Sequence, residues 1–309
     1  MSILNGLITY GDVSRREDVV LNAVEYLTAV EDSIQNILGK TEAIDTVHSF
    51  LVDTYTTAAS KAVAMNTDFS LSALTTPTRL TNIVQEVAEA IQVARPQEKI
   101  QHYHGENETM RQTTKALKNW GNAVEFDLVR GTLQSGLSGT IAKMSGIIVA
   151  ISKSTNTTAH TSGTVFSATI LDGLMTDNWT HSNGDVATDL YVGGILRRVV
   201  DNFVQKTNMV VNAPRDVVNI VRTVSTYETS MGTLSVHKHR YVDISGTDAT
   251  CRVLGIRPEK IKIAYLDKPF IKDLAEGGAY TKKAVYGSMT VEVRNQDSNF
   301  FASGFLRSA

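Results

Sequence analysis

The stretch from Glu106 to Gln134, ENETMRQTTKALKNWGNAVEFDLVRGTLQ, predicts one long helix with no proline to interrupt it. At 1.5 Å per residue this helix would be roughly 40 Å long, comparable to the diameter of a small domain. Asn107 can cap its first free N–H groups, and Gly136 and Gly139 in the following QSGLSG can adopt positive φ angles that stop it.

Apolar side chains recur along this stretch at steps of three and four, which predicts a buried stripe: Leu117, Trp120, Val124 and Leu128. A second stripe in the C-terminal half predicts burial on most sides there: Ala123, Phe126, Val129 and Leu133. A central core helix of an ordinary enzyme would show the same pattern. The helix alone therefore does not identify the class of protein, and the segments on either side of it have to be considered.

The composition allows a sizeable core and no strong electrostatic partner. Of 309 residues, 42% are hydrophobic and 20% charged, and 30 basic against 32 acidic side chains leave a net charge of −2. No block of Lys and Arg stands out, so we expect no high-affinity nucleic-acid surface. Cys251 is the only cysteine, which excludes an internal disulfide framework and suits a reducing cytoplasm. No signal peptide or membrane-spanning apolar run is evident.

Two segments before the helix lack a core of their own. Residues 1–40 carry an interrupted helical period and predict an arm that lies along another surface, or a terminal helix packed on its own chain. The segments Thr46–Thr57 and Arg79–Val93 alternate loosely, as two strands would, although the second also permits an amphipathic helix over 81–94. A two-stranded hairpin is marginally stable alone, so we expect a neighbouring subunit to cover it.

After the helix, the sequence predicts a compact α/β unit over residues 140–258. Its expected elements are a buried strand at Met144–Ile151, an exposed loop at Ser152–Phe166, and a helix at Val186–Gln205 capped by Asp185. A strand at Met209–Asn212 and a helix opened by Pro214 follow. The glycine pair Gly193-Gly194 inside a predicted helix indicates that another group packs closely there.

The last third is mostly strand. One strand is expected over Val236–Ile244, and Ile261, Ile263 and Tyr265 alternate with lysines further on. From Val285 to Arg294 the pattern puts Met289, Val291 and Val293 inward and Thr290, Glu292 and Arg294 outward.

The sequence shows few motifs typical of catalysis, cofactor binding or metal binding. There is no GxGxxG, P-loop or CxxC motif, and Ser138 in GLSGT does not fit a nucleophile elbow. Two His-x-His pairs, His102/His104 and His237/His239, could each begin a metal site, but neither has a third ligand at a telling spacing. Ordinary strand histidines explain them as well. We expect no catalytic residue, no cofactor and no metal.

The order of segments resembles the major capsid protein of tailed bacteriophages, the Hong Kong 97-type fold, and in particular the family typified by phage SU-ten. The residues that carry the resemblance run through nearly the whole chain: Tyr10 to Asp18, Thr78 to Asn82, Leu117-Lys118 through Val124-Glu125, Gly131 to Leu133, Ala264 to Phe270, Leu274-Ala275 and Val291 to Asn295. Where a proline-bearing turn would be expected after the arm, this chain has Leu27 to Val30.

The resemblance implies an α+β Hong Kong 97-type fold with five parts. These would be an N-terminal arm (1–40), an extended hairpin or E-loop (41–93), a peripheral domain with the long spine helix (94–139), an α/β axial domain (140–258), and the strands that complete the peripheral domain (259–309). The expected function is self-assembly as hexamers and pentamers into an icosahedral head that encloses double-stranded DNA. The expected partners are copies of the chain itself, a portal, scaffolding or cement proteins, and DNA by weak non-specific proximity, with no membrane. The expected location is the virion, assembled in the host cytoplasm.

Side chains of the arm and hairpin would then make the contacts between subunits: Leu21, Val24, Leu27, Phe50, Leu51, Lys61, Phe69, Leu71, Leu74 and Arg79. Lys61 lies in the hairpin tip, where one branch of the fold forms a Lys–Asn cross-link, although the sequence identifies no partner. Two alternatives stay open. One is an encapsulin-like bacterial nanocompartment of the same fold, and the other is a cytoplasmic α/β enzyme assisted by a metal at His237 and His239.

Overall fold

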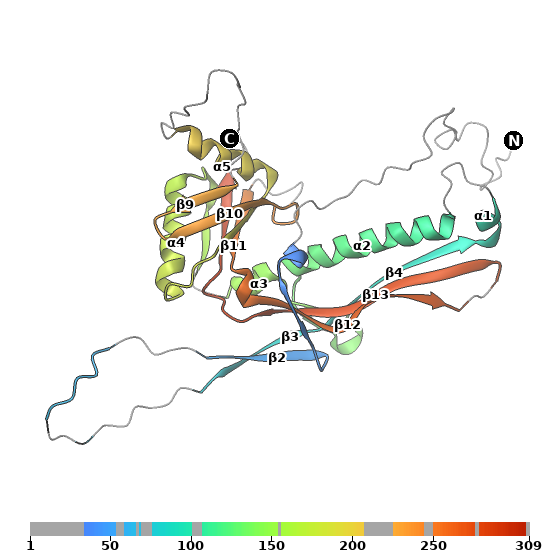
Figure 1. Cartoon of the computed structure of the whole chain (residues 1–309), viewed down its shortest axis with the longest axis horizontal. Coiled ribbons are helices and arrows are strands. Elements are labelled where there is room, and N and C mark those ends of the chain that lie inside the picture. The colour runs from blue at the N-terminus through green and yellow to red at the C-terminus, as the bar shows by residue number, and fades with distance from the viewer. Residues whose placement is uncertain are drawn as a thin grey trace, which may run out of the picture.

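The structure is a computed structural model that describes residues 34–53, 59–65, 68, 76–100, 107–153, 156–206, 225–243, 250–275 and 278–306. Helices and strands are mixed in an elongated molecule, which confirms the α+β class. In Figure 1 the long helix α2 (Glu108–Arg130) lies along a sheet, a second sheet with its helices sits near the C-terminal end of α2, and a thin hairpin projects from the body.

The first sheet supports α2. Its four strands lie in the order β1 (Gly39–Glu42), β12 (Ile261–Leu274), β13 (Tyr280–Val293) and β4 (Gln85–Ala94). β1 is parallel to β12 and the other pairs are antiparallel. The short helix α1 (Arg95–Lys99) follows β4, and α2 packs on β4 and β13.

The long helix is confirmed, although it is shorter than predicted. The Asn107 side chain caps it by accepting a hydrogen bond from the Thr109 N–H at 3.0 Å, and Gly131 ends it three residues before Gln134. Trp120, Val124 and Leu128 are buried as expected, and Ala116 takes the buried place predicted for the more exposed Leu117.

The prediction of a second buried stripe on α2 is wrong. Only Val129 of that set is buried, whereas Ala123, Phe126 and Leu133 are exposed. The sheet covers one side of the helix, and away from it only short segments contact α2 among the described residues, such as the turn whose Tyr241 ring meets Phe126 edge-on.

The second sheet forms a separate unit. Its six strands lie in the order β7 (Thr157–Thr164), β14 (Phe300–Leu306), β11 (Thr250–Ile256), β8 (Asp189–Val192), β10 (Gly232–Lys238) and β9 (Thr226–Thr229). Helices α4 (Ala168–His181) and α5 (Gly194–Lys206) pack beside it around Leu171, Leu174 and Leu196. β14, from the end of the chain, lies in this sheet, whereas β12 and β13 lie with α2.

Two segments of this unit differ from the prediction in secondary structure. Met144–Ile151 is not a strand, because Ile147–Ile151 forms the short helix α3. Before it the chain forms the two-stranded pair of β5 (Gln134–Ser135) and β6 (Ala142–Lys143). A short apolar run fits a buried helix as well as a buried strand. The predicted loop at Ser152–Phe166 contains β7, because its β-branched threonines pair in parallel with β14.

The helix predicted over Val186–Gln205 is split into β8 and α5 at Gly193. A Cβ atom on Gly193 would lie 1.7 Å from Oδ2 of Asp243, whereas one on Gly194 would meet nothing within 4 Å, so the close packing predicted for the glycine pair is confirmed at Gly193 alone. The strand predicted at Met209–Asn212 and the helix predicted from Pro214 lie outside the described residues. The strand expected at Val236–Ile244 begins earlier, at Gly232, and ends at Lys238.

The outward positions predicted for β13 are partly wrong. Ile261, Ile263, Met289, Val291 and Val293 are buried as expected, but Thr290 and Glu292 are buried too. β13 is a central strand, and the face opposite α2 is met by the base of the projecting hairpin, where His48 contacts Glu292.

A close approach of two backbones joins the two units. The Gly131 N–H donates to the Asp127 carbonyl at 2.7 Å, and the Gly146 N–H donates to the Gly131 carbonyl at 2.8 Å. A Cβ on Gly131 would lie 2.5 Å from the Asp127 carbonyl oxygen, and one on Gly146 would lie 2.5 Å from the Gly131 nitrogen. Neither position has room for a side chain, so this contact fixes how α2 continues into α3.

Candidate functional site

Among the described residues, the projecting hairpin forms a two-stranded sheet of its own, apart from the two larger sheets. It consists of β2 (Val47–Val52) paired antiparallel with β3 (Thr78–Ile83), with Val47 opposite Ile83 and Val52 opposite Thr78. The predicted strand Arg79–Val93 is divided at Val84: β3 belongs to the hairpin and β4 to the first sheet, so the alternative of a helix over 81–94 is wrong. In Figure 1 the hairpin extends away from α2, beyond the sheets.

The two faces of the hairpin differ. Val47, Ser49 and Leu51 share one face, and His48, Phe50 and Val52 share the other, because side chains alternate along a strand. Leu51 is 67% exposed and Val47 is 47% exposed, while Phe50 is half-buried beside His48.

Two predicted contact residues lie across the strands from one another. Arg79 is opposite Leu51, and its guanidinium donates to the Ser49 hydroxyl at 2.8 Å. Lys61 is exposed in the described 59–65 segment, as are Val63 and Met65. The other predicted contact residues lie outside the described residues: Leu21, Val24, Leu27, Phe69, Leu71 and Leu74.

Buried polar contacts anchor the hairpin base. The Asn82 amide nitrogen donates to the carbonyls of Val291 at 2.8 Å and Ser145 at 3.1 Å, and its oxygen accepts from the Ser145 N–H at 2.9 Å. His48 Nε2 lies 3.2 Å from the buried Glu292 carboxylate, which also pairs with Arg294. These directional contacts fix the angle at which the hairpin leaves the body.

A second anchor follows where the chain enters β4. The Gln85 amide donates to the Asp127 carboxylate on α2, and its oxygen accepts from the Met144 N–H at 3.1 Å. Burial raises the pKa of the Asp127 carboxyl, and the Gln85 hydrogen bond and the nearby Lys143 oppose that rise. Hairpin, spine helix and the segment leading to α3 are thereby tied together.

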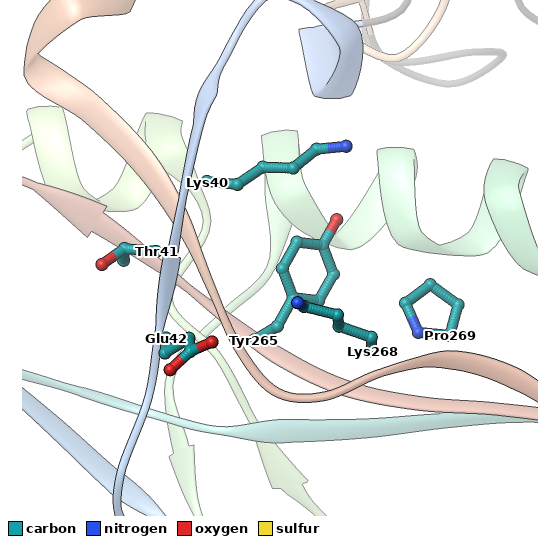
Figure 2. A pocket seen from close by; sticks show the side chains of 6 residues that line it. All are labelled: Lys40, Thr41, Glu42, Tyr265, Lys268 and Pro269. Atoms are coloured by element: carbon teal, nitrogen blue, oxygen red, sulfur yellow. The ribbon is translucent and has the colours of Figure 1, made fainter.

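One surface hollow of about 340 Å³ lies where β1 joins β12. Figure 2 shows the side chains that line it: Lys40, Thr41, Glu42, Tyr265, Lys268 and Pro269. It coincides with irregularities in β12, whose register to β13 shifts between Tyr265 and Phe270. Burial raises the pKa of the Tyr265 hydroxyl, so this group stays protonated near neutral pH. The lining has no nucleophile paired with a base.

The histidine pair does not form a metal site in the described part of the chain. His237 lies 3.1 Å from Asp189, and His239 lies 2.9 Å from Glu125, so each has its own carboxylate. No group of three or more His, Cys, Asp or Glu side chains gathers among the described residues. His102 and His104 lie outside them. None of the described helices is both long and apolar enough to cross a bilayer.

Exposed apolar side chains also occur where the sequence analysis named no contact. One set surrounds the β5–β6 turn: Leu133, Leu137 and Ile141. Another lies on the β12–β13 hairpin: Leu266, Phe270 and Ile271. The sequence did not indicate that these side chains are exposed, since an apolar residue on a strand or turn is normally assigned to the core.

The polar anchors were missed as well. Glu125 lies next to Val124 inside the apolar stripe of a long helix, and a carboxylate in such a place is a usable signal of a buried partner.

The family model described as SU10 major capsid protein matches residues 12–305. The chain belongs to this family. It is a major capsid protein with the Hong Kong 97-type fold, a subunit of an icosahedral shell. No curated protein sequence matches the chain at a significant level.

Solved structures with the same fold have very different sequences. The capsid of Myoviridae phage XM1 matches with a TM-score of 0.62 and 11% identity, covering 97% of this chain and 100% of that one. The capsid of a native GTA particle matches with a TM-score of 0.62 and 11% identity over 99% and 100% of the two chains. The SrpI encapsulin complex from Synechococcus elongatus PCC 7942 matches with a TM-score of 0.62 and 9% identity over 98% of each. At these identities the likeness concerns the fold.

Proposed function

We propose that the projecting hairpin and the arm make the principal contacts between subunits of the shell. In this proposal residues 1–40 are the arm, 41–93 contain the hairpin, 94–139 and 259–309 form the peripheral domain, and 140–258 form the axial domain around the symmetry axes. The strand pairing refines it: β1 and β4 belong to the peripheral sheet, β14 belongs to the axial sheet, and the hairpin proper is β2 and β3 with the chain between them.

The observation that carries the proposal is the contrast between the two ends of the hairpin. Its base is held by buried polar contacts at Asn82 and His48, whereas Leu51, nearer the tip, exposes its apolar side chain on the same face as the exposed Val47 of the base. An isolated two-stranded hairpin buries too little to stabilise itself, so a rigid base with an apolar outer face suits a neighbouring subunit. Phe50, Lys61 and Arg79 would lie at the same contact, together with the predicted residues outside the described segments.

The energy per contact is small, and repetition makes it large. Complete burial of a leucine side chain is worth about 1.5–3 kcal/mol, so covering the exposed two-thirds of Leu51 would contribute roughly 1–2 kcal/mol. Fixing side chains at the contact offsets part of this gain. Because every subunit repeats the contact with its neighbour, a loss of this size at one position acts throughout the shell.

The experiment is assembly of full-length Leu51→Asp, with Leu51→Met as the matched control that keeps an apolar side chain. Negative-stain electron microscopy and light scattering measure closed particles, and circular dichroism measures folding. We expect Leu51→Asp to remain folded, because the position is exposed, and to form few or no particles, whereas Leu51→Met assembles normally. Normal particle yield with Leu51→Asp would contradict the proposed contact.

We also propose that the shell encloses double-stranded DNA, is assembled in the host cytoplasm with a portal and scaffolding or cement proteins, and has no catalytic function. The near-neutral net charge of −2 suits weak contact with packaged DNA better than tight binding. An encapsulin-like nanocompartment is the second candidate, because one fold neighbour is such a shell. Absorbance and mass spectrometry of particles isolated from the cells that produce them distinguish the two: nuclease-protected DNA supports a phage head, and a protein cargo without DNA overturns that assignment.

A further inference from the structure

A buried carboxylate at the middle of the molecule receives hydrogen bonds from two segments far apart in the sequence. Glu125 of α2 is 1% exposed. Its Oε1 accepts from the backbone N–H of Ile34 at 2.6 Å and from His239 Nε2 at 2.9 Å, and its Oε2 accepts from the N–H of Gln35 at 3.3 Å. Ile34 and Gln35 open η2 (Ile34–Asn36), the first described element of the chain, and His239 directly follows β10 of the second sheet.

The contacts around His239 determine where its proton lies. The Tyr241 N–H donates to Nδ1 of His239 at 3.3 Å, so Nδ1 acts as the acceptor and Nε2 carries the hydrogen that is given to Glu125. His239 is 3% exposed, and its ring packs edge-on against Tyr191 and Tyr241. The imidazole is therefore a fixed donor with one orientation.

The segment before β1 has a second bond to the same helix. The Gln35 side-chain amide donates to the Gly121 carbonyl at 2.9 Å, one turn before Glu125. Ile34 and Leu38 are buried in the core that α2 shares with the second unit, which includes Tyr191 and Val242. Segment 34–38 and turn 239–242 thus meet at α2.

A carboxylate in such a place couples its donors. If one donor is withdrawn, the charge loses compensation where water has little access, and it must either take up a proton or admit water. A protonated carboxyl is a weaker acceptor than a carboxylate, and an opened site exposes the bonds that remain. Either route weakens the hydrogen bond from the other segment, so the two contacts reinforce each other.

We infer that Glu125 is a positioning residue that couples the end of the arm to the axial unit, so that segment 34–38 and turn 239–242 dock on the spine helix or loosen from it together. Residues 1–33 join the described chain at Ile34, so this coupling connects the arm with the unit proposed to surround the symmetry axes. The inference concerns one subunit and does not depend on the hairpin contact proposed above.

The test perturbs one side and measures the other. Hydrogen–deuterium exchange with mass spectrometry is applied to the unassembled full-length chain carrying His239→Ala. We expect the amides of Ile34 and Gln35 to exchange roughly tenfold to a hundredfold faster, the range typical of losing a hydrogen bond to a charged group. His239→Gln, which retains an N–H donor, should restore much of the protection. The matched control is His181→Ala, because the exposed His181 contacts the Asp177 carbonyl of its own helix, and it should leave Ile34 unchanged.

The reciprocal variant is Gln35→Ala, which should speed exchange at the Tyr241 amide although Gln35 does not bond to it. Should His239→Ala fail to fold, Glu125→Gln removes the charge with little change in shape and should accelerate exchange in both segments. Faster exchange confined to the mutated side, in His239→Ala and in Gln35→Ala alike, would overturn the coupling. A failure of the Leu51 variant to assemble would not change this exchange result, so the two proposals can be refuted independently.

Discussion

The same substitution should have opposite effects at two glycines at either end of the C-terminal half of α2. At Gly131 a Cβ atom would lie 2.5 Å from the Asp127 carbonyl oxygen and 2.7 Å from the Met144 carbonyl oxygen. At Gly121, inside α2, it would meet nothing within 4 Å. Gly131→Ala therefore tests the backbone junction between the spine helix and α3, and Gly121→Ala is its matched control.

The magnitude for Gly131→Ala follows from the two contacts. Real Cβ atoms essentially never approach other atoms closer than 3.0 Å, so the backbone must move by several tenths of an ångström. Overpacking of this kind costs about 1–3 kcal/mol. The movement also stretches the bonds from the Gly131 N–H (2.7 Å) and the Gly146 N–H (2.8 Å), each worth about 1 kcal/mol. Reduced freedom of the unfolded chain returns about 0.4–1 kcal/mol. The net destabilisation is about 2–4 kcal/mol.

Gly121→Ala should stabilise instead. Alanine in a helix interior is favoured over glycine by about 0.8–1 kcal/mol, and no neighbouring atom opposes it here. The hydrogen bond from Gln35 to the Gly121 carbonyl involves the backbone and should persist.

The assay is urea unfolding of the unassembled chain followed by circular dichroism, with thermal melting as a second measurement. At about 2.1 cal/mol/K of unfolding entropy per residue, a change of 1 kcal/mol shifts the Tm of a chain of 309 residues by roughly 1.5 °C. Gly131→Ala should therefore melt roughly 3–6 °C lower and Gly121→Ala roughly 1–2 °C higher. Particle formation by Gly131→Ala should fall as well, because a displaced junction reorients the axial unit. Equal stability of Gly131→Ala and the unaltered chain would refute the argument that the junction has no room for a methyl group.

Three further outcomes follow from the structure. Burial raises the pKa of Asp127, so the folded state holds the carboxyl proton more tightly than the unfolded chain does. The free energy of unfolding should therefore fall as the pH rises from about 4. In urea titrations at several pH values, Asp127→Asn should show a shallower decline of this free energy. The thiol of Cys251, 2% exposed, should react with a thiol reagent only on unfolding, measured by absorbance with and without urea. Asn82→Ala should cost about 2–4 kcal/mol of unfolding free energy because it orphans buried backbone groups, whereas Asn119→Ala, which removes one long exposed bond, should change it by under about 0.5 kcal/mol.

Sequence periodicity was informative where one strong local signal agreed with tertiary packing. The long helix follows from the spacing of Trp120, Val124 and Leu128 and from the cap at Asn107, all of which act within a few turns. The close packing at Gly193 could likewise be predicted from the sequence, because glycines inside a predicted helix are unfavourable unless a neighbouring group occupies the space of a side chain.

The failures have a common physical origin. Ile147–Ile151 is apolar throughout, and burial on most sides removes the periodicity that separates helix from strand. Ser152–Phe166 is polar because β7 is an edge strand, so its pairing with β14 leaves most of its side chains partly in solvent. Glu292 alternates as an outward residue would, yet His48 from a distant part of the chain covers it. Long-range contacts of this kind are not encoded in local spacing.

Polar and apolar groups have different roles in such a subunit: buried hydrogen bonds maintain its shape, and exposed apolar side chains suit contacts with other subunits. Apolar contacts are strong in sum but weakly directional, so they suit the outer hairpin, where Leu51 exposes an apolar side chain at the proposed subunit contact. Buried hydrogen bonds contribute little net energy but are lost steeply when misaligned, so they suit the places that set angles. Asn82 fixes the hairpin and Gln85 fixes the entry to β4, while Glu125 accepts hydrogen bonds from segment 34–38 and from His239. In a subunit whose internal angles were set by apolar packing alone, the segments would adopt several similar orientations. Because every subunit would repeat this variation, the shell would not close.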